Sequence, residues 1–188
     1  MDPDQAAVRR VLAGEVSAFR ELVERHERAL FVYLGNLARH PQDAEDLAQE
    51  SFLTAYEQLA RFDPARGAFS TWLFTLARRR ALNHLAAARR RPTRPLDTAD
   101  ADEGAAPPAD HRLPEHVVAG EDLARRLDAA LDALPDEQRS AFVLARFVQL
   151  PYAEIAAVEG VEVGTVKSRV ARARDRLRQQ LPRRSEIF

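Results

Sequence analysis

The chain has 188 residues, a hydrophobic fraction of 46% and a formal net charge of −1, which leaves room for one or two small domains. It contains no cysteine, which excludes disulfide bonds and thiolate metal sites and is typical of a reducing compartment. Residues 1–15 lack the apolar core of a signal peptide, and no apolar run is long enough to span a membrane. We therefore expect a soluble, cytoplasmic protein without membrane insertion.

Four amphipathic segments follow one another in the first half of the chain. A short helix is predicted at residues 5–13, and Ser17 can cap a longer second helix. A third helix begins at Pro41, which a first helical turn tolerates, and a loop with Pro and Gly at residues 62–67 separates it from a fourth. We predict a helical domain over residues 1–91. Apolar residues at helical spacing are Phe19, Leu22, Val23, Leu30, Leu34, Leu37, Ala44, Leu47, Ala48, Phe52, Ala55, Leu59, Leu73, Leu76, Ala77 and Leu85.

Residues 92–114 are rich in Pro, Ala and Asp and lack the large apolar side chains that a core needs. We expect a flexible acidic linker there, followed by a second helical domain over residues 115–188. No strand-like alternation occurs in the sequence, so the predicted fold class is all-α, with two small helical domains joined by the linker. The apolar pattern of the second domain begins with Leu123, Leu127, Leu131, Leu134, Phe142, Val143 and Phe147.

The last part of the second domain has the pattern of a helix-turn-helix. Residues 152–159 form a short helix, Gly160 permits a tight turn, Val161 and Val163 can plug the core, and Thr165 can cap a second helix. One face of that second helix is apolar and consists of Val166, Val170, Ala173 and Leu177. The opposite face is basic or polar and consists of Lys167, Ser168, Arg169, Ala171, Arg172, Arg174, Arg176 and Arg178.

Such a helix meets the requirements for entry into the major groove of DNA. Arg and Lys side chains in its first turns can reach base edges, and arginines further along can reach phosphates. Basic clusters at 78–94 and 164–184, separated by an acidic stretch at 97–122, indicate a polyanion that is contacted at two places. A helical hairpin with a solvated basic face is the alternative. The predicted DNA-binding residues are Thr165, Lys167, Ser168, Arg169, Ala171, Arg172 and Arg176.

Two segments resemble bacterial RNA polymerase sigma factors of the extracytoplasmic-function (ECF) class. GTVKSRVARARDRL resembles the recognition helix of that class, and DAEDLAQESFLTAYEQL followed by FSTWLFTLARRRALNHL resembles its first conserved domain. The resemblance covers nearly the whole chain. It implies a non-enzymatic transcription initiation factor without a cofactor, which binds core RNA polymerase and promoter DNA and has an anti-sigma factor as a further partner.

The resemblance also implies a polymerase-binding helix. The helix from Asp43 to Tyr56 matches the part of the family that docks on the β′ coiled coil of the polymerase. Acidic residues favoured by the helix dipole are the alternative interpretation, above all for Asp43. The implied contact residues are Asp43, Asp46, Gln49 and Glu50.

The loop at residues 62–71 and the helix after it match the part of the family that captures an unpaired base of the downstream promoter element. Trp72 is either a core residue or part of that site, and Phe69 is either a core plug or a wall of the base pocket. Where the family commonly has Asn, this chain has Arg79, which grips a phosphate or stacks on a base. The implied residues are Arg66, Phe69, Ser70, Thr71, Trp72, Arg79 and Asn83.

A second departure is Pro151, where the family usually has a capping Ser or Thr, and loss of such a cap costs about 1 kcal/mol. The acidic linker is either a mimic of nucleic acid in a basic channel or a solvated tether. A helix-turn-helix regulator that binds duplex DNA without polymerase is the alternative function, although it would leave the first domain unused. An enzyme has no support, because the histidines are scattered and no Gly-rich phosphate loop is present. We expect no metal site at Asp110, His111 and His116, because the first two lie in the linker, the third lies just after it, and their spacing fits no common helical site.

Overall fold

The computed structural model describes residues 2–38, 40–90 and 121–181. Within these ranges every regular element is a helix, which confirms the all-α prediction and the two helical domains. The linker predicted at residues 92–114 lies outside the described residues, as do residues 115–120 and the chain beyond residue 181. The helices are α1 (Pro3–Leu12), η1 (Val16–Ala18), α2 (Phe19–Ala38), α3 (Pro41–Glu57), η2 (Leu59–Arg61), α4 (Phe69–Arg90), α5 (Glu121–Asp132), α6 (Asp136–Arg146), α7 (Tyr152–Glu159) and α8 (Val163–Gln180).

Proline and glycine set several helix boundaries where the sequence predicts them. Pro41 is the first residue of α3. Pro151 stands in the N-cap position of α7 without a side-chain cap, and its carbonyl accepts the backbone N–H groups of Glu154 and Ile155 at 2.9 and 3.0 Å. Gly160 ends α7 in the left-handed conformation, with φ of 66°, which costs little without a Cβ.

Two predicted side-chain caps are wrong. Ser17 lies inside the 3-10 turn η1, and α2 begins directly after that turn at Phe19. Thr165 is the third residue of α8, whose N-cap is Glu162 without a side-chain cap hydrogen bond. In both places helical backbone begins before the predicted cap residue. This residue therefore lies inside the helical segment, and its hydroxyl is not at the N-cap position.

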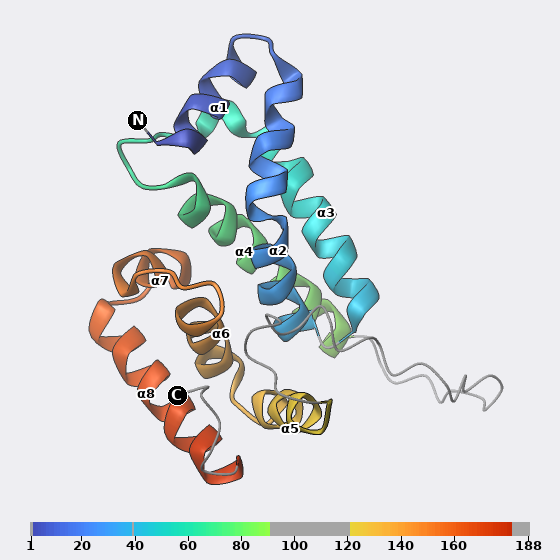
Figure 1. Cartoon of the computed structure of the whole chain (residues 1–188), viewed down its shortest axis with the longest axis vertical. Coiled ribbons are helices and arrows are strands. Elements are labelled where there is room, and N and C mark those ends of the chain that lie inside the picture. Colours follow the sequence, from blue (N-terminus) through green and yellow to red (C-terminus); the bar gives the residue numbers. More distant parts are fainter. Residues whose placement is uncertain (1, 39, 91–120, 182–188) are drawn as a thin grey trace, which may run out of the picture.

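The first domain is built around α2, which packs against α3, α4 and α1 (Figure 1). Buried apolar side chains from all these helices fill its core, and Tyr33 and Phe74 meet edge to face with ring centroids 5.5 Å apart. The nearly buried Asp4 fixes α1 to α2, since its carboxylate pairs with Arg25 and lies 2.8 Å from His26 Nε2.

The second domain packs α6 and α7 against α8, and α5 also contacts α8. Its core includes Leu127, Leu131 and Leu144, all less than 2% exposed. Arg139 is fully buried, and its guanidinium donates to Asp132 at 3.1 Å and to Asp136 at 2.8 Å. A buried charge persists only when it is paired in this way.

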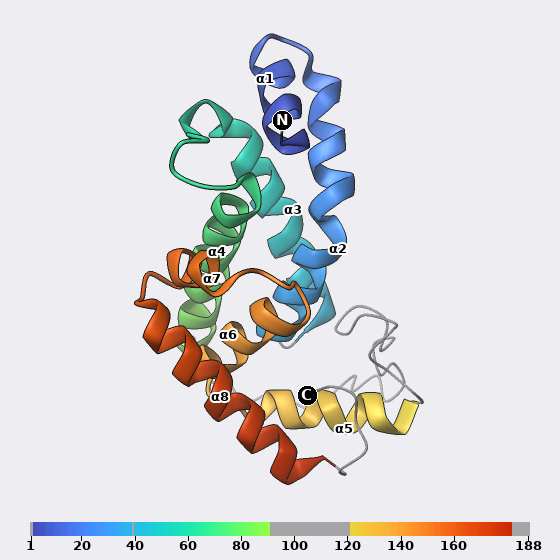
Figure 2. The ribbon, with the colours of Figure 1, turned by 60° about the vertical axis from the view of Figure 1, so that its left-hand side comes forward.

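The two domains contact each other through two pairs of helices. α6 lies against α2, and α7 lies against α4 (Figures 1 and 2). The hydroxyls of Tyr33 and Ser140 are 3.1 Å apart in the first contact. In the second, Thr71 Oγ1 donates to Glu154 Oε2 at 2.6 Å. These contacts join the second domain, which carries the basic helix α8, to the first domain, which carries the loop before α4.

Candidate functional site

The helix α8 has the two faces that the sequence predicts. Val166, Ala173 and Leu177 are fully buried, and Val170 packs against the same core. The exposed residues of the opposite face are Lys167, Arg172, Arg174, Asp175, Arg176 and Arg178. Because α7, the turn at Gly160 and α8 form one packed unit, the exposed face is held rigidly and is dominated by positive charge.

Arg169 does not share the exposed environment of its basic neighbours. Its side chain is 15% exposed, and its guanidinium donates to Glu159 at 2.6 Å and to Glu137 at 2.8 Å. These two bonds tie α8 to α7 and α6. The guanidinium N–H groups of Arg169, which the sequence analysis assigns to DNA binding, are therefore bonded to carboxylates within the domain.

The three remaining residues predicted on this helix for DNA are half-buried. Ser168 donates its hydroxyl hydrogen to the Thr165 carbonyl at 2.9 Å, and Ala171 lies between the two faces. The exposed side chains in the first three turns of α8 are thus Lys167 and Arg172.

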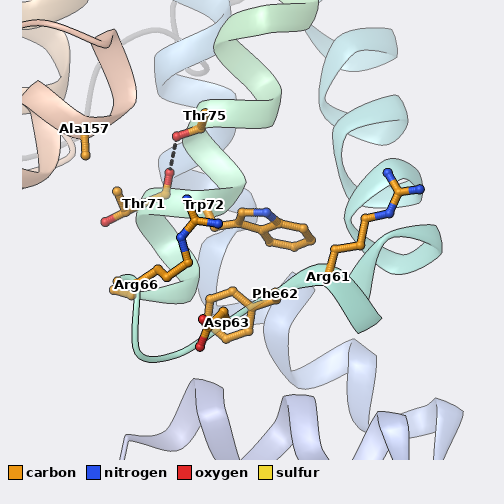
Figure 3. A pocket seen from close by; sticks show the side chains of 10 residues that line it. Arg61, Phe62, Asp63, Arg66, Thr71, Trp72, Thr75 and Ala157 are labelled. Atoms are coloured by element: carbon orange, nitrogen blue, oxygen red, sulfur yellow. Dashed lines mark hydrogen bonds between the residues drawn. The ribbon is translucent and has the colours of Figure 1, made fainter.

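A pocket of about 250 Å³ lies between the loop at residues 62–68 and the first turns of α4 (Figure 3). The loop is shaped by Asp63, whose carboxylate accepts the backbone N–H of Ala65 at 2.9 Å. The volume is just below the range of about 300–1,000 Å³ that is typical of small-molecule sites. The pocket is lined by Arg61, Phe62, Asp63, Arg66, Gly67, Ala68, Thr71, Trp72, Thr75 and Ala157.

Three aromatic rings form the base of this pocket. The ring centroids of Phe62, Phe69 and Trp72 are 5.6 to 5.7 Å apart in each pair. Phe69 is 0% exposed and belongs to the core, so it supports the pocket from behind and does not line it. Trp72 is half-buried; it packs against the core and also lines the pocket. The rings of Phe62 and Trp72, inclined at 47° to each other, and the exposed Arg66 can accept an aromatic, anionic ligand such as a nucleotide.

The other residues predicted for the downstream element are spread along α4. Ser70 is half-buried in the first turn, and Arg79 is exposed. Asn83 lines a different groove, between α3 and α4. Since a helix rises 1.5 Å per residue, Asn83 is about 16 Å along the axis from Trp72. The structure therefore brings Arg66, Thr71 and Trp72 together and leaves Arg79 and Asn83 outside their pocket.

The acidic residues predicted on α3 lie beside α4. Asp43 Oδ2 is 3.2 Å from His84 Nε2, and Glu50 Oε2 accepts from Arg80 Nη1 at 2.5 Å. Asp46 and Gln49 are exposed. These residues form a charged ridge along α3, next to a groove of about 390 Å³ between α3 and α4.

The same ridge continues into an apolar patch that the sequence analysis does not identify. Leu53 is 58% exposed, Tyr56 39% and Val16 57%. They line a groove of about 460 Å³ together with Phe19 and Phe52. Exposed apolar patches of this kind mark interaction sites. One feature of the sequence could have identified this patch. Leu53 and Tyr56 are large apolar residues that lie outside the apolar face predicted for this helix.

Among the described residues, no group of three or more His, Asp or Glu side chains is arranged to hold a metal ion. Among the same residues, no helix is long and apolar enough to cross a membrane.

Comparison with known proteins agrees with this geometry. Residues 22–91 match the family model of sigma-70 region 2, and residues 124–177 match that of sigma-70 region 4. The chain is 35% identical to the RNA polymerase sigma-H factor of Pseudomonas aeruginosa, over 93% of this chain and 91% of that protein. It is also 35% identical to the ECF RNA polymerase sigma-E factor of Escherichia coli K12, over 92% of this chain and 91% of that protein.

Two solved structures have a similar fold. One is CnrH in complex with the cytosolic domain of CnrY, with a TM-score of 0.69, 26% identity and coverage of 94% of this chain and 95% of the other. The second is the sigma factor RpoE of Bartonella quintana in complex with the anti-sigma factor NepR, with a TM-score of 0.68, 28% identity and coverage of 86% and 95%. On the strength of both sigma-70 regions and of relatives that match over nearly the whole length, the chain belongs to the ECF class of bacterial RNA polymerase sigma factors, which are not enzymes.

Proposed function

We propose that the protein, which as a sigma factor directs RNA polymerase to promoters, does so with three separate surfaces. The exposed basic face of α8 reads the upstream promoter element as duplex DNA. The aromatic pocket beside Trp72 captures an unpaired base of the downstream element. The ridge and apolar groove on α3 dock on the β′ coiled coil of the polymerase. This function belongs to the cytoplasm, where polymerase and promoter DNA meet.

The division of exposed and buried groups on α8 supports duplex reading. Lys167 and Arg172 are exposed in the first three turns of the helix, where side chains reach base edges in helix-turn-helix proteins. Arg172→Ala is expected to weaken binding to the cognate upstream element by about 1–3 kcal/mol and to relax specificity at one base pair. Binding to a set of single-base variants of the element measures both effects. An equal loss on every sequence would limit Arg172 to a phosphate contact.

The pocket is the observation that carries base capture. Its aromatic side chains can stack on a base, and Arg66 at the pocket and Arg79 further along α4 are exposed cations that can bind the phosphates of a strand. The double variant Arg66→Ala with Arg79→Ala is expected to bind polymerase and upstream duplex but to fail in promoter opening. A pre-melted template is expected to restore much of the activity, because the unpairing cost of a few kcal/mol is then already met.

Permanganate reactivity of unpaired thymines measures opening on both templates. Arg125→Ala, which removes an exposed cation from α5, is the matched control and is expected to open promoters normally. Normal promoter opening by the double variant would mean that other residues of the first domain melt the promoter. A defect that the pre-melted template does not relieve would mean that these arginines do not stabilise the open strand.

The continuity of the acidic ridge with the apolar groove supports polymerase docking. Protein interfaces combine an apolar centre with a charged rim, and Leu53 with Tyr56 provides such a centre next to Glu50. Charge reversal at Asp46 and Glu50 is expected to abolish binding to core polymerase without changing the circular dichroism spectrum. The control reverses Glu24 and Glu27, two exposed acids of α2. If the Asp46 and Glu50 variant binds core polymerase like the control, α3 is not the docking helix.

An anti-sigma factor is the further partner that we infer. The solved relative from Bartonella quintana is held by the anti-sigma factor NepR, and the exposed apolar groove at Leu53 needs a covering partner whenever polymerase is absent.

A further inference from the structure

The aromatic side chains of the pocket are supported by a ring from another helix. Phe62 and Trp72 line the pocket (Figure 3), and both contact the fully buried Phe69 with ring centroids 5.7 Å apart. The imidazole of His26, on α2, also lies against Phe69, with ring centroids 5.6 Å apart and an angle of 43° between the rings. A single ring, that of Phe69, therefore connects His26 to the two aromatic residues of the pocket.

The imidazole is held by an acid of the N-terminal helix α1. His26 Nε2 lies 2.8 Å from one carboxylate oxygen of Asp4, and Arg25 donates to the other. Burial raises the pKa of Asp4, but the hydrogen bonds from His26 and Arg25 outweigh it and leave the pKa below its ordinary value. The carboxylate is therefore ionised at neutral pH and only accepts hydrogen bonds, so the imidazole donates through Nε2. This bond fixes the orientation of the His26 ring against Phe69.

The position of this acid is not explained by the attachment of α1 alone. The match to sigma-70 region 2 begins at residue 22 and does not include α1, and α1 lines neither the pocket nor the groove at Leu53. Ala7 and Val8 already bury one face of α1 in the core. A nearly buried carboxylate is a costly way to add attachment, because apolar residues of similar size often stabilise as much as a buried ion pair does. The carboxylate does, however, hold its partner in one orientation, which apolar packing does less strictly.

We propose that Asp4 and His26 are positioning residues of the pocket, although neither lines it. Asp4 sets the orientation of the His26 ring, and this ring supports Phe69. Phe69 in turn keeps Phe62 and Trp72 in place for stacking on a base. Side chains that are ordered before binding lose little freedom when a base is captured. This inference rests on the proposed role of the pocket as a base site.

Substitutions at His26 separate the effect of its ring from that of its hydrogen bond. His26→Gln keeps an N–H donor for Asp4 but has no ring, whereas His26→Phe keeps a ring against Phe69 without the hydrogen bond. Asp4→Ala releases the imidazole. The double variant, Asp4→Ala with His26→Phe, is expected to regain the parental pocket, because a phenyl ring stays among apolar neighbours without a carboxylate to hold it. If the pair were only a tie between α1 and α2, His26→Phe could not rescue Asp4→Ala, since the bond is still missing.

Arg10→Ala is the matched control. It removes a different ion pair between α1 and α2, in which the exposed Arg10 lies 2.7 Å from Glu21. It therefore weakens the attachment of α1 and leaves Asp4 and His26 unchanged. Binding to core polymerase and to upstream duplex DNA is expected to be parental in all variants and reports that both domains are folded.

The pocket is followed by two measurements. Trp72 is the single tryptophan of the chain, so the tryptophan band in the near-UV circular dichroism spectrum of the full-length chain reports how firmly its ring is held. Promoter opening by the holoenzyme is measured by permanganate reactivity. His26→Gln and Asp4→Ala are expected to weaken the band and to lower opening by about two- to tenfold, the factor for one side chain that must be ordered on binding. His26→Phe, the double variant and Arg10→Ala are expected to stay near the parental level.

The positioning role is overturned if His26→Gln keeps the parental tryptophan band, or if His26→Phe does not restore the band in the Asp4→Ala chain. It is also overturned if Arg10→Ala weakens the band as much as Asp4→Ala does. Should Asp4→Ala not fold, the comparison of His26→Gln with His26→Phe decides alone. If the band changes in the expected order but every variant opens the promoter normally, the positioning of Trp72 holds and the proposed base capture fails.

Discussion

Removal of the Arg169 guanidinium is expected mainly to lower the stability of the second domain, rather than to remove a direct contact with DNA. The side chain of Glu159 is 0% exposed, and Arg169 is its cationic partner at 2.6 Å. Removal of one member of a buried ion pair costs about 3–5 kcal/mol, because the other charge stays buried without compensation. The second partner, Glu137, is 68% exposed, so its pairing adds about 0–1 kcal/mol.

The 15% exposure of the Arg169 side chain lets some water reach the pair, which places the expected loss near the lower limit, at about 3 kcal/mol. With a urea dependence of about 1–3 kcal/mol per molar, Arg169→Ala lowers the unfolding midpoint of the second domain by about 1–3 M. A second substitution, Glu159→Gln, removes the uncompensated charge and is expected to restore part of the loss.

Urea unfolding followed by hydrogen exchange in α6 to α8 is the assay, since it separates the second domain from the first. Arg172→Ala is the matched control, because this exposed side chain is expected to change stability by less than about 0.5 kcal/mol while weakening DNA binding. The reasoning is refuted if Arg169→Ala unfolds at the parental midpoint and loses DNA affinity to the same degree as Arg172→Ala. Arg169 would then be a DNA contact, as the sequence predicts.

Two further predictions concern stability. Gly160→Ala is expected to lower the free energy of unfolding in urea by about 1–2 kcal/mol, because φ at this position is 66°. Gly164→Ala, in open space within α8, is the control and is expected to be neutral or stabilising by up to about 1 kcal/mol. Equal effects of the two substitutions would argue against the left-handed turn. Burial raises the pKa of Asp4, but hydrogen bonds from His26 and Arg25 outweigh it and leave the pKa below its ordinary value. The attachment of α1 is therefore complete above about pH 4 and is lost as the pH falls through the lowered pKa. Hydrogen exchange of α1 measures this, and Asp4→Asn should remove the dependence.

The sequence predicts well those features that depend on residues close together in the chain. The period of apolar residues identifies the buried face of α8, and Gly160 marks the turn, because both depend on neighbours within a few residues. The role of Arg169 could not be predicted in the same way. Its partner Glu137 is 32 residues away, and only the packing of three helices brings the two together. The periodicity places both residues on polar faces and does not indicate which polar faces meet.

The pocket is a further feature that depends on contacts between residues far apart in the sequence, which the sequence pattern does not predict. Phe69 and Trp72 lie three residues apart near the start of one predicted helix, and the sequence leaves both interpretations of each residue open. Burial separates them: Phe69 is a core residue and Trp72 lines the pocket. The contact between Thr71 and Glu154 spans 83 residues, and that between Tyr33 and Ser140 spans 107. No pattern in the intervening sequence predicts which surfaces of two separate domains touch.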